Sequence, residues 1–200
     1  MKLIKEWEGM AVHFMNLFKN AVEISKRICE QRLKEGDIAI DCTMGNDTVF
    51  LCSLIGEDGK VYAFDIQESA VFNTRQNLLQ YGYLERAELI LDGHQNIDKY
   101  VQEEVQLILF NLGYLPKGNH DITTKKDTTI EAVEKCLNIL KLKGVILLVI
   151  YPGHLSGSEE KEALENFTSK LNQKKFTVTK LSFLNQINHP SELICIEKVC

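Results

Sequence analysis

The sequence predicts an α/β protein with a central, mostly parallel sheet of seven strands flanked by helices, in which the last strand is antiparallel. Three observations support this fold class. The stretch Gly36–Gln67 has the pattern of a strand, a tight loop, a helix and a second strand. Apolar runs such as Ile38–Ile40 and Val145–Ile150 are typical of parallel strands that are buried on both faces. Between such runs, apolar residues recur at helical spacing.

The expected helices and strands alternate along the chain. We predict helices over residues 12–34 (in one or two pieces), 48–55, 69–80, 130–140 and 158–172. We predict strands over residues 38–40, 61–64, 87–91, 105–110, 145–150, 176–184 and 192–199. Gly82 is placed to end one helix, and Thr128 or Thr129 is placed to cap the next.

The bulk properties are those of an ordinary globular domain. A chain of 200 residues is long enough for one domain over residues 1–200, with a helical lead-in over about residues 1–35. Hydrophobic residues make up 44% and charged residues 26% of the chain. No apolar run approaches the length of a membrane span, and the N-terminus lacks the apolar core of a signal peptide. We therefore expect a cytoplasmic protein with no membrane contact.

The six cysteines do not form a C-x-x-C pair. Four lie in apolar helix or strand patterns, namely Cys29, Cys52, Cys136 and Cys195. Buried free thiols are the expectation, with no metal site and no disulfides. Cys42 directly follows the first strand, where a small packing residue is the better interpretation.

The first strand–loop–helix–strand unit has the layout of a nucleotide-cofactor site. Asp65 follows Asp41 by 24 residues, about where a carboxylate meets ribose hydroxyls at the carboxyl edge of a sheet. A dinucleotide site would carry G-x-G-x-x-G to hold a pyrophosphate. This loop has one glycine, Gly45, and an acidic residue, Asp47, which would repel a pyrophosphate but suit an ammonium group. The pattern favours S-adenosylmethionine over NAD; a plain βαβ unit with an Asp-rich turn is the alternative.

The third strand ends in Asp92-Gly93-His94. An aspartate at this place commonly reaches the adenine amino group in methyltransferases, and a neighbouring polar side chain can cover the ring. His94 is therefore a candidate cofactor contact; the alternative is that it only caps the turn that follows.

The fourth strand opens into a loop that begins Asn111-Leu112-Gly113-Tyr114. This loop is similar to the N-P-P-Y loop of methyltransferases that modify an exocyclic or side-chain nitrogen. An amine nucleophile aims its lone pair at the methyl carbon, so its hydrogens need acceptors, and an Asn side-chain oxygen is one. Tyr114 offers a face on which a base can stack. The alternative is a tight βα turn whose Asn and Gly satisfy its dihedral angles.

The fifth strand ends in Tyr151-Pro152-Gly153-His154, at the same edge of the predicted sheet. Tyr151 and His154 are therefore substrate-side candidates. The imidazole of His154 could take a proton from an ammonium nucleophile, since its pKa lies in the useful range. It could equally be a loop histidine with no such duty.

With these residues in view, the chain resembles the class I methyltransferase family of rRNA methylases, which includes a bacterial tRNA 5-(aminomethyl)-2-thiouridine methyltransferase. The resemblance runs from about Ala21 to the end of the chain. The matching stretches are IDCTMGNDTVFL, VYAFDIQ, LILDGHQNID, LFNLGYLP, ITTK and TTIEA near residues 122–132, VIYPGH, and FLNQINHP followed by LICIEK.

This resemblance implies a Rossmann-like sheet, S-adenosylmethionine as the methyl donor, and the wobble uridine of a tRNA anticodon stem-loop as the substrate. The predicted substrate-side and catalytic residues are Asn111, Tyr114, Tyr151 and His154. The predicted cofactor contacts are Asp41, Thr43, Gly45, Asn46, Asp47, Thr48, Asp65, Ile66, Gln67, Asp92, Gly93 and His94.

The chain departs from the family pattern at two places. The family usually has a loop of the form G-N-G-x-D-T, whereas this chain has Gly45-Asn46-Asp47-Thr48, which is two residues shorter. The shorter loop implies either a tighter turn with weaker cofactor binding or residues of the natural chain that are absent from this sequence. The second departure is His189-Pro190, where relatives tend to show consecutive prolines.

The net charge of −5 argues against a surface that coats nucleic acid broadly, so an RNA contact would be local. Lys117, Lys125 and Lys126 form the candidate basic rim; a solvated surface is the alternative. Three functional hypotheses remain: a tRNA amine N-methyltransferase, a methyltransferase acting on rRNA or a small-molecule amine, and an RNA-binding relic with an impaired cofactor site. A homodimer is possible under each of them.

Overall fold

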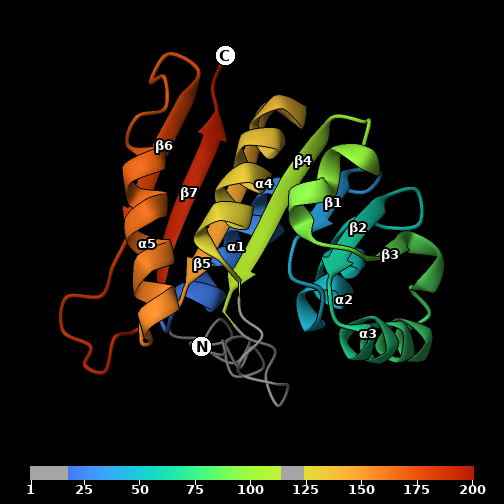
Figure 1. Ribbon diagram of the computed structural model, residues 1–200. Helices are drawn as coiled ribbons and strands as arrows, with labels where there is room; N and C mark the ends of the chain where they lie inside the picture. The colour runs from blue at the N-terminus through green and yellow to red at the C-terminus, as the bar shows by residue number, and fades with distance from the viewer. Residues whose placement is uncertain (1–17, 114–123) are drawn as a thin grey trace, which may run out of the picture.

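The computed structural model describes residues 18–113 and 124–200, and its centre is a seven-stranded sheet (Figure 1). The strands lie in the order β3-β2-β1-β4-β5-β7-β6. Their bounds are Ile38–Asp41 (β1), Lys60–Asp65 (β2), Ala87–Leu91 (β3), Val105–Leu112 (β4), Leu140–Ile150 (β5), Phe176–Leu181 (β6) and Glu192–Lys198 (β7). Only the two pairs that β7 makes, with β5 and β6, are antiparallel, which confirms the prediction for the last strand.

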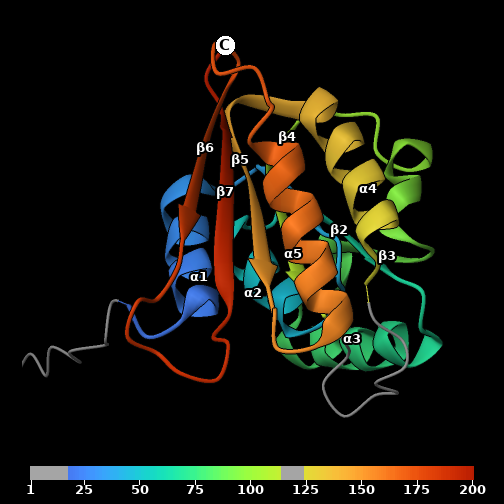
Figure 2. The same cartoon turned by 60° about the vertical axis from the view of Figure 1, so that its left-hand side comes forward.

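Helices cover both faces of this sheet (Figure 2). One face carries α1 (Ala21–Arg32), α2 (Asn46–Leu54) and α3 (Glu68–Tyr81), whose buried side chains form one apolar cluster with the strands. The other face carries α4 (Lys126–Ile139), α5 (Leu155–Thr168) and the 3-10 helix η2 (His94–Lys99), which contribute to a second cluster. A short 3-10 helix, η1 (Leu84–Arg86), precedes β3. The result is the three-layer arrangement of an α/β fold.

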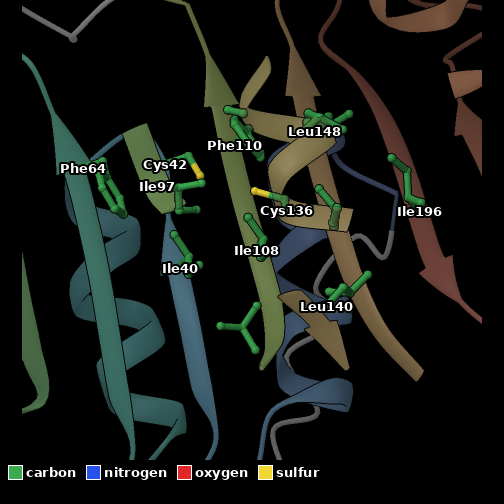
Figure 3. Packing of buried hydrophobic residues seen from close by; sticks show 14 of the residues in the cluster. Ile40, Cys42, Phe64, Ile97, Ile108, Phe110, Cys136, Leu140, Leu148 and Ile196 are labelled. Carbon is green, nitrogen blue, oxygen red and sulfur yellow. The ribbon is translucent and has the colours of Figure 1, made fainter. Parts of the chain in front are cut away.

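The strands contribute to the two clusters in alternation. Ala39 and Leu107 belong to the cluster under α1, α2 and α3, whereas their neighbours Ile40 and Ile108 belong to the cluster under α4 and α5. Successive side chains of a strand point to opposite faces, so a central strand that is buried on both sides must be apolar at every position. Figure 3 shows the second cluster, in which Ile108 and its neighbours pack beside Cys136 of α4.

The cysteine prediction is confirmed for the thiols inside the two clusters. Cys29, Cys52 and Cys136 are buried free thiols, and Cys195 is a half-buried one. Cys42 is also buried and belongs to the same apolar cluster as Cys136, as expected for a packing residue. Burial raises the pKa of Cys42 well above its usual value, so this thiol stays protonated.

The starts of α4 and α5 lie earlier in the chain than the sequence predicts. The helix α4 begins at Lys126, so Thr128 and Thr129 lie inside its first turn and do not cap it. The hydroxyl of Thr129 donates instead to Glu160 of α5 at 2.6 Å, a contact between elements that local sequence does not reveal. The helix α5 begins at Leu155, because the ring of His154 accepts a hydrogen bond from the Gly157 N–H and so acts as the N-cap.

The strand β5 begins five residues before its predicted start. Leu140 pairs with Val105, and the register then shifts before Leu107 pairs with Val145. Lys143 has a φ of 64°, so the irregularity lies at a residue in the left-handed region. The strand extends back to Leu140 because Leu140 pairs with Val105 of β4, and residues 141–144 form the irregular part between the two paired stretches.

The first helix is described from Ala21 onward, and the predicted part over residues 12–17 lies outside the described residues. At the end of α3, Gly82 adopts a left-handed conformation with a φ of 72°, as its predicted role as a terminator requires. No helix in the described part of the chain is long and apolar enough to cross a membrane.

Candidate active site

The carboxyl ends of β1 to β5 surround a cavity of about 1200 Å³. In Figure 1 the arrowheads of β1, β4 and β5 all point toward this edge of the sheet. Among the predicted site residues, thirteen line the cavity: Thr43, Gly45, Asn46, Asp47, Asp65, Ile66, Gln67, Asp92, Gly93, His94, Asn111, Tyr151 and His154. The volume exceeds that of a typical pocket for one ligand, up to roughly 1000 Å³, so a cofactor and part of a second molecule fit together.

Two predicted cofactor contacts, Asp41 and Thr48, do not line the cavity. Both residues are fully buried behind its wall. The hydroxyl of Thr48 donates to Asp41 Oδ2 at 2.6 Å, and the Thr43 N–H donates to Asp41 Oδ1 at 3.0 Å. The Gly45 N–H in turn donates to Thr48 Oγ1 at 3.2 Å. Asp41 and Thr48 therefore hold the loop that lines the cavity. The geometry does not support their predicted role as direct cofactor contacts.

The pKa of Asp41 is raised to about 7 by burial and by the nearby negative charge of Asp47. The hydrogen bonds from Thr48 and Thr43 act in the opposite direction, because they stabilise the ionised carboxylate.

The loop after β1 is short, yet it is tied to the strands on both sides. The Cys42 N–H donates to the carbonyl oxygen of Leu109 in β4 at 2.8 Å. The Met44 N–H donates to the carbonyl oxygen of Phe64 in β2 at 2.8 Å. The loop thus remains at the cavity wall despite lacking two residues of the usual family pattern.

Asn111 at the end of β4 is held by residues of the first loop and helix. Its N–H donates to Thr43 Oγ1 at 2.9 Å, and its Nδ2 donates to Asp47 Oδ2 at 3.1 Å. The remaining atom, Oδ1, is buried and accepts no hydrogen bond from the described residues. Because Asp47 only accepts, it determines which way the amide points, and the oxygen is left as an acceptor for a bound molecule.

His94 offers a second acceptor. Its Nδ1 lies 2.9 Å from the carbonyl oxygen of Cys42, which only accepts, so Nδ1 carries the hydrogen and Nε2 carries a lone pair. Nε2 is buried and receives no hydrogen bond from the described residues. Burial lowers the pKa of His94, so the ring stays neutral and Nε2 stays an acceptor at neutral pH.

The end of β2 supplies a carboxylate and an apolar surface. The Gln67 N–H donates to Asp65 Oδ1 at 2.9 Å, and Asp65 lines the cavity. Burial raises the pKa of Asp65, although hydrogen bonds from the Gln67 and Ile66 amides oppose this effect. Ile66 is 62% exposed beside the cavity, where a flat ring could cover it.

Asp92 lines the cavity, but its carboxylate is already engaged. Oδ1 accepts from the Gly93 N–H at 2.7 Å and from Asn96 Nδ2 at 2.9 Å, and Oδ2 accepts from the Tyr100 hydroxyl at 3.0 Å. These bonds lower the pKa of Asp92 despite the opposing effect of burial. His94 Nε2, two residues further along the chain, is thus the better placed acceptor for an adenine amino group.

On the substrate side, Tyr151 and His154 line the cavity, whereas Tyr114 and Lys117 lie outside the described residues. The Gly157 N–H donates to His154 Nδ1 at 3.0 Å, and the Ser156 hydroxyl lies 2.9 Å from the same nitrogen. Nδ1 is therefore an acceptor, and in the neutral ring the hydrogen is on Nε2. In this tautomer Nε2 is a donor, so the geometry does not support the predicted role of His154 as a base.

Several lining residues were missed by the sequence reasoning. They come from α1, α3 and α4, from the segment just before α4 and from the β6–β7 loop: Lys26, Asn73, Thr74, Asn77, Thr124, Thr128 and His189. Asn73 and Asn77 are four residues apart on α3, and this polar pair on one helix face was the available signal. Lys26 Nζ lies 3.9 Å from Asp47 Oδ1, a contact between α1 and α2 that spacing alone does not show.

The cavity groups match the parts of S-adenosylmethionine. Asp65 can accept from ribose hydroxyls, His94 Nε2 from the adenine amino group, and Asp47 from the ammonium group. The buried acceptor on His94 is the most telling of these, because a buried polar atom without a partner is costly unless a ligand satisfies it. Within the described residues, no group of three or more His, Cys, Asp or Glu side chains is arranged to hold a metal ion.

Comparisons with known proteins agree with this geometry. Residues 61–197 match the family model described as "Putative rRNA methylase". The chloroplast protein of Arabidopsis thaliana named tRNA (mnm(5)s(2)U34)-methyltransferase is 37% identical over 195 residues, covering 92% of this chain and 71% of the relative.

Two solved structures are also close to this chain. A crystal structure from Clostridium thermocellum with the same rRNA-methylase description is 46% identical, with a TM-score of 0.89, covering 90% of this chain and 98% of that one. A Streptococcus mutans protein described as a methyltransferase was solved in complex with SAH, S-adenosylhomocysteine. It is 44% identical, with a TM-score of 0.83, covering 90% of this chain and 99% of that one.

The resemblance read from the sequence is thereby confirmed, and so is the cofactor. The strand order, the antiparallel last strand and the acceptors at the strand ends agree with the same assignment. The chain belongs to the rRNA methylase family of class I methyltransferases and is an S-adenosylmethionine-dependent enzyme.

Proposed function

We propose that this protein methylates the primary amine of 5-aminomethyl-2-thiouridine at the wobble position of a tRNA anticodon. The observation that carries the proposal is Asn111 Oδ1, a buried acceptor that Asp47 orients at the end of β4. An amine nucleophile needs such an acceptor for its hydrogens, whereas a carbon or hydroxyl nucleophile would need a strong base. The name of the Arabidopsis relative supports the same substrate.

The chemistry asked of the protein is mainly positioning. When bound, S-adenosylmethionine supplies an electrophilic methyl group on its sulfonium, and a neutral amine can attack it in line. Asn111 Oδ1 accepts an amine hydrogen and so aims the lone pair, while Tyr151 at the cavity wall faces the substrate side. Correct alignment of two bound reactants supplies a large part of the rate enhancement without covalent help. Water takes the ammonium proton, since His154 presents its acceptor nitrogen to Gly157.

A local contact with the RNA backbone is assigned to Lys125. This residue precedes α4, lines the cavity, and pairs with no carboxylate in residues 18–113 and 124–200. Its neighbour Lys126 points elsewhere, because its Nζ is 3.2 Å from Glu159 and the residue does not line the cavity. An unpaired cation at the described part of the rim suits an acidic protein that binds a small RNA loop.

The test is methyl transfer from radiolabelled S-adenosylmethionine to three synthetic RNAs. One is an anticodon stem-loop with 5-aminomethyl-2-thiouridine, the second is the same stem-loop with 2-thiouridine, and the third is an rRNA hairpin. We expect label only in the first, in the modified nucleoside. Label in the rRNA hairpin, or in the stem-loop that lacks the amine, would refute the proposed substrate. Asn111→Ala serves as the catalytically impaired control.

A further inference from the structure

A second pocket lies directly beside the reaction cavity. Its volume is about 410 Å³, and it is formed by the segment after β5, the first turns of α5 and the β6–β7 loop. Figures 1 and 2 both place this loop at the end of the sheet where α5 begins. The lining residues are Pro152, Ser158, Lys161, Ser182, Phe183, Gln186, Asn188, His189, Pro190 and Glu192.

The two pockets share a wall. Tyr151, Gly153 and His154 line the reaction cavity, whereas Pro152, between them, lines the second pocket. His189 lines both pockets, and its Cβ lies about 4.0 Å from the place where a Cβ on Gly153 would be. A polymer with one unit in the reaction cavity would therefore have an adjacent unit at the second pocket.

Ion pairs brace the base of this second pocket. Glu192 Oε1 lies 2.6 Å from Lys161 Nζ, and Glu192 Oε2 lies 2.9 Å from Lys180 Nζ. The hydroxyl of Ser182 also donates to Glu192 Oε2 at 3.0 Å. These contacts join α5, β6 and β7, so the walls of the pocket are formed before anything binds. The ion pair with Glu192 also neutralises the charge of Lys161, so the pocket is polar and not cationic.

The loop itself presents amide side chains in an unusual backbone conformation. Asn188 has a φ of 62° and His189 a φ of 51°, so two consecutive non-glycine residues lie in the left-handed region. Such conformations are costly and concentrate at functional sites. The side-chain amides of Gln186 and Asn188 make no hydrogen bond with the described part of the chain, and both residues are exposed.

We propose that this second pocket binds the base of a nucleotide next to the methylated one. Asn and Gln amides pair with the donor and acceptor edges of bases, and single-stranded RNA loops are recognised through such splayed bases. The ring of Phe183 supplies an apolar wall. A phosphate is disfavoured because Lys161 is already paired with Glu192. This inference rests on the proposed RNA substrate and adds where its neighbouring base binds.

The protein variants for the test are Gln186→Ala and Asn188→Gly. Glycine at position 188 removes the amide but tolerates the positive φ, so the loop conformation is kept. The matched control is Leu184→Ala, since Leu184 lies in the same loop, is fully exposed and lines neither pocket. The RNA is the stem-loop with 5-aminomethyl-2-thiouridine, together with versions in which the base on either side of that nucleotide is replaced by an abasic site.

Binding is measured by fluorescence anisotropy with S-adenosylhomocysteine present, and methylation is measured with the stem-loop and with the isolated nucleoside. We expect each amide variant to bind the stem-loop about tenfold more weakly, equivalent to about 1.4 kcal/mol, while Leu184→Ala binds normally. One of the two abasic RNAs should bind the unmodified protein about as weakly as the intact stem-loop binds the amide variants. Its affinity should not fall further with Asn188→Gly, because the contact is already absent. Methylation of the isolated nucleoside should be retained, since neither amide lines the reaction cavity.

The inference would be overturned if both amide variants bound the stem-loop with unchanged affinity. It would also be overturned if each abasic substitution weakened binding to Asn188→Gly as much as it weakens binding to the unmodified protein. Failure of the proposed function looks different: the amide variants would weaken RNA binding, yet no preparation would methylate the amine. Conversely, the nucleoside could be methylated while both amide variants bind the stem-loop as tightly as the unmodified protein does. That result would support the proposed reaction and show that the second pocket does not bind the RNA.

Discussion

Asp47 Oδ2 accepts a hydrogen bond from Asn111 Nδ2 at 3.1 Å, joining the first turn of α2 to the end of β4 across 64 residues of sequence. Both residues line the cavity. In the function proposed above, Asp47 contacts the cofactor and Asn111 the substrate amine, so this bond would connect the two halves of the site.

The first prediction concerns this pair. Asn111→Ala should lower kcat by about 100-fold, similar to the loss of one preorganised polar contact, and should leave the Kd for S-adenosylmethionine unchanged. Asp47→Ala should lower both kcat and cofactor affinity. The double variant should lose little more in kcat than Asn111→Ala, because the two residues act as a unit. Steady-state kinetics and calorimetry measure these quantities, and independent losses in kcat would contradict the proposed coupling.

Asp65 is predicted to hold the cofactor, because its carboxylate lies at the end of β2 on the wall of the cavity. Asp65→Ala should weaken S-adenosylmethionine binding by roughly 10- to 100-fold, the range expected for lost hydrogen bonds to a charged group. Asp58→Ala is the matched control, since Asp58 is exposed in the turn before β2 and does not line the cavity. Calorimetric titration would show equal affinities for both variants if Asp65 had no ribose contact.

The adjacent lysines 125 and 126 allow a test of the RNA contact. Lys125→Ala should raise the KM for a stem-loop RNA several-fold and reduce the salt dependence of binding by about one counterion. Lys126→Ala should do neither, because that lysine is paired with Glu159 away from the cavity. Affinity measured over a series of salt concentrations distinguishes the two variants. The same salt dependence for both variants would show that Lys125 makes no specific contact with the RNA.

The buried carboxyl of Asp41 predicts a pH dependence of stability. Its pKa is raised from 3.8 to about 7, so the folded protein keeps this proton where the unfolded chain has lost it. Asp41 therefore favours folding at low pH, and its contribution is lost progressively as the pH rises from about 3.8 to about 7. Above that window both states are ionised and the slope vanishes.

Asp41→Asn removes this titration. The free energy of unfolding of the variant, relative to the unmodified protein, should therefore rise across the same window by an amount on the order of a few kcal/mol. His94 acts in the opposite sense, because its lowered pKa makes stability fall as the pH drops below about 6.5. Urea unfolding of both proteins at several pH values isolates Asp41, since His94 is common to them. A constant difference would show that Asp41 is ionised throughout.

Much of the fold could be read from local patterns. The runs Ile38–Ile40 and Val145–Ile150 identify central strands because both faces of such strands are buried, and Gly82 identifies a helix end because it can adopt a left-handed φ. The boundaries that failed depend on partners far away in the chain. Leu140 extends β5 by pairing with Val105, and Thr129 lies within α4, where its hydroxyl meets Glu160.

The site divides in the same way. Asp65, His94 and Asn111 could be named from the sequence, because parallel strands bring the residues that follow them to one edge of the sheet. The sequence could not show that Asp41 lies behind the wall, that the carboxylate of Asp92 is already engaged, or that His94 and not Asp92 presents a vacant acceptor.

The succession of helices and strands along the chain thus follows from periodicity and from residue chemistry, which act over a few residues. Which atoms remain available to a ligand depends on burial and on hydrogen bonds between segments that meet only in the folded state. The Nδ2 of Asn111 and the Nδ1 of His94 are taken by Asp47 and Cys42, and only this packing leaves Oδ1 and Nε2 for the bound molecules.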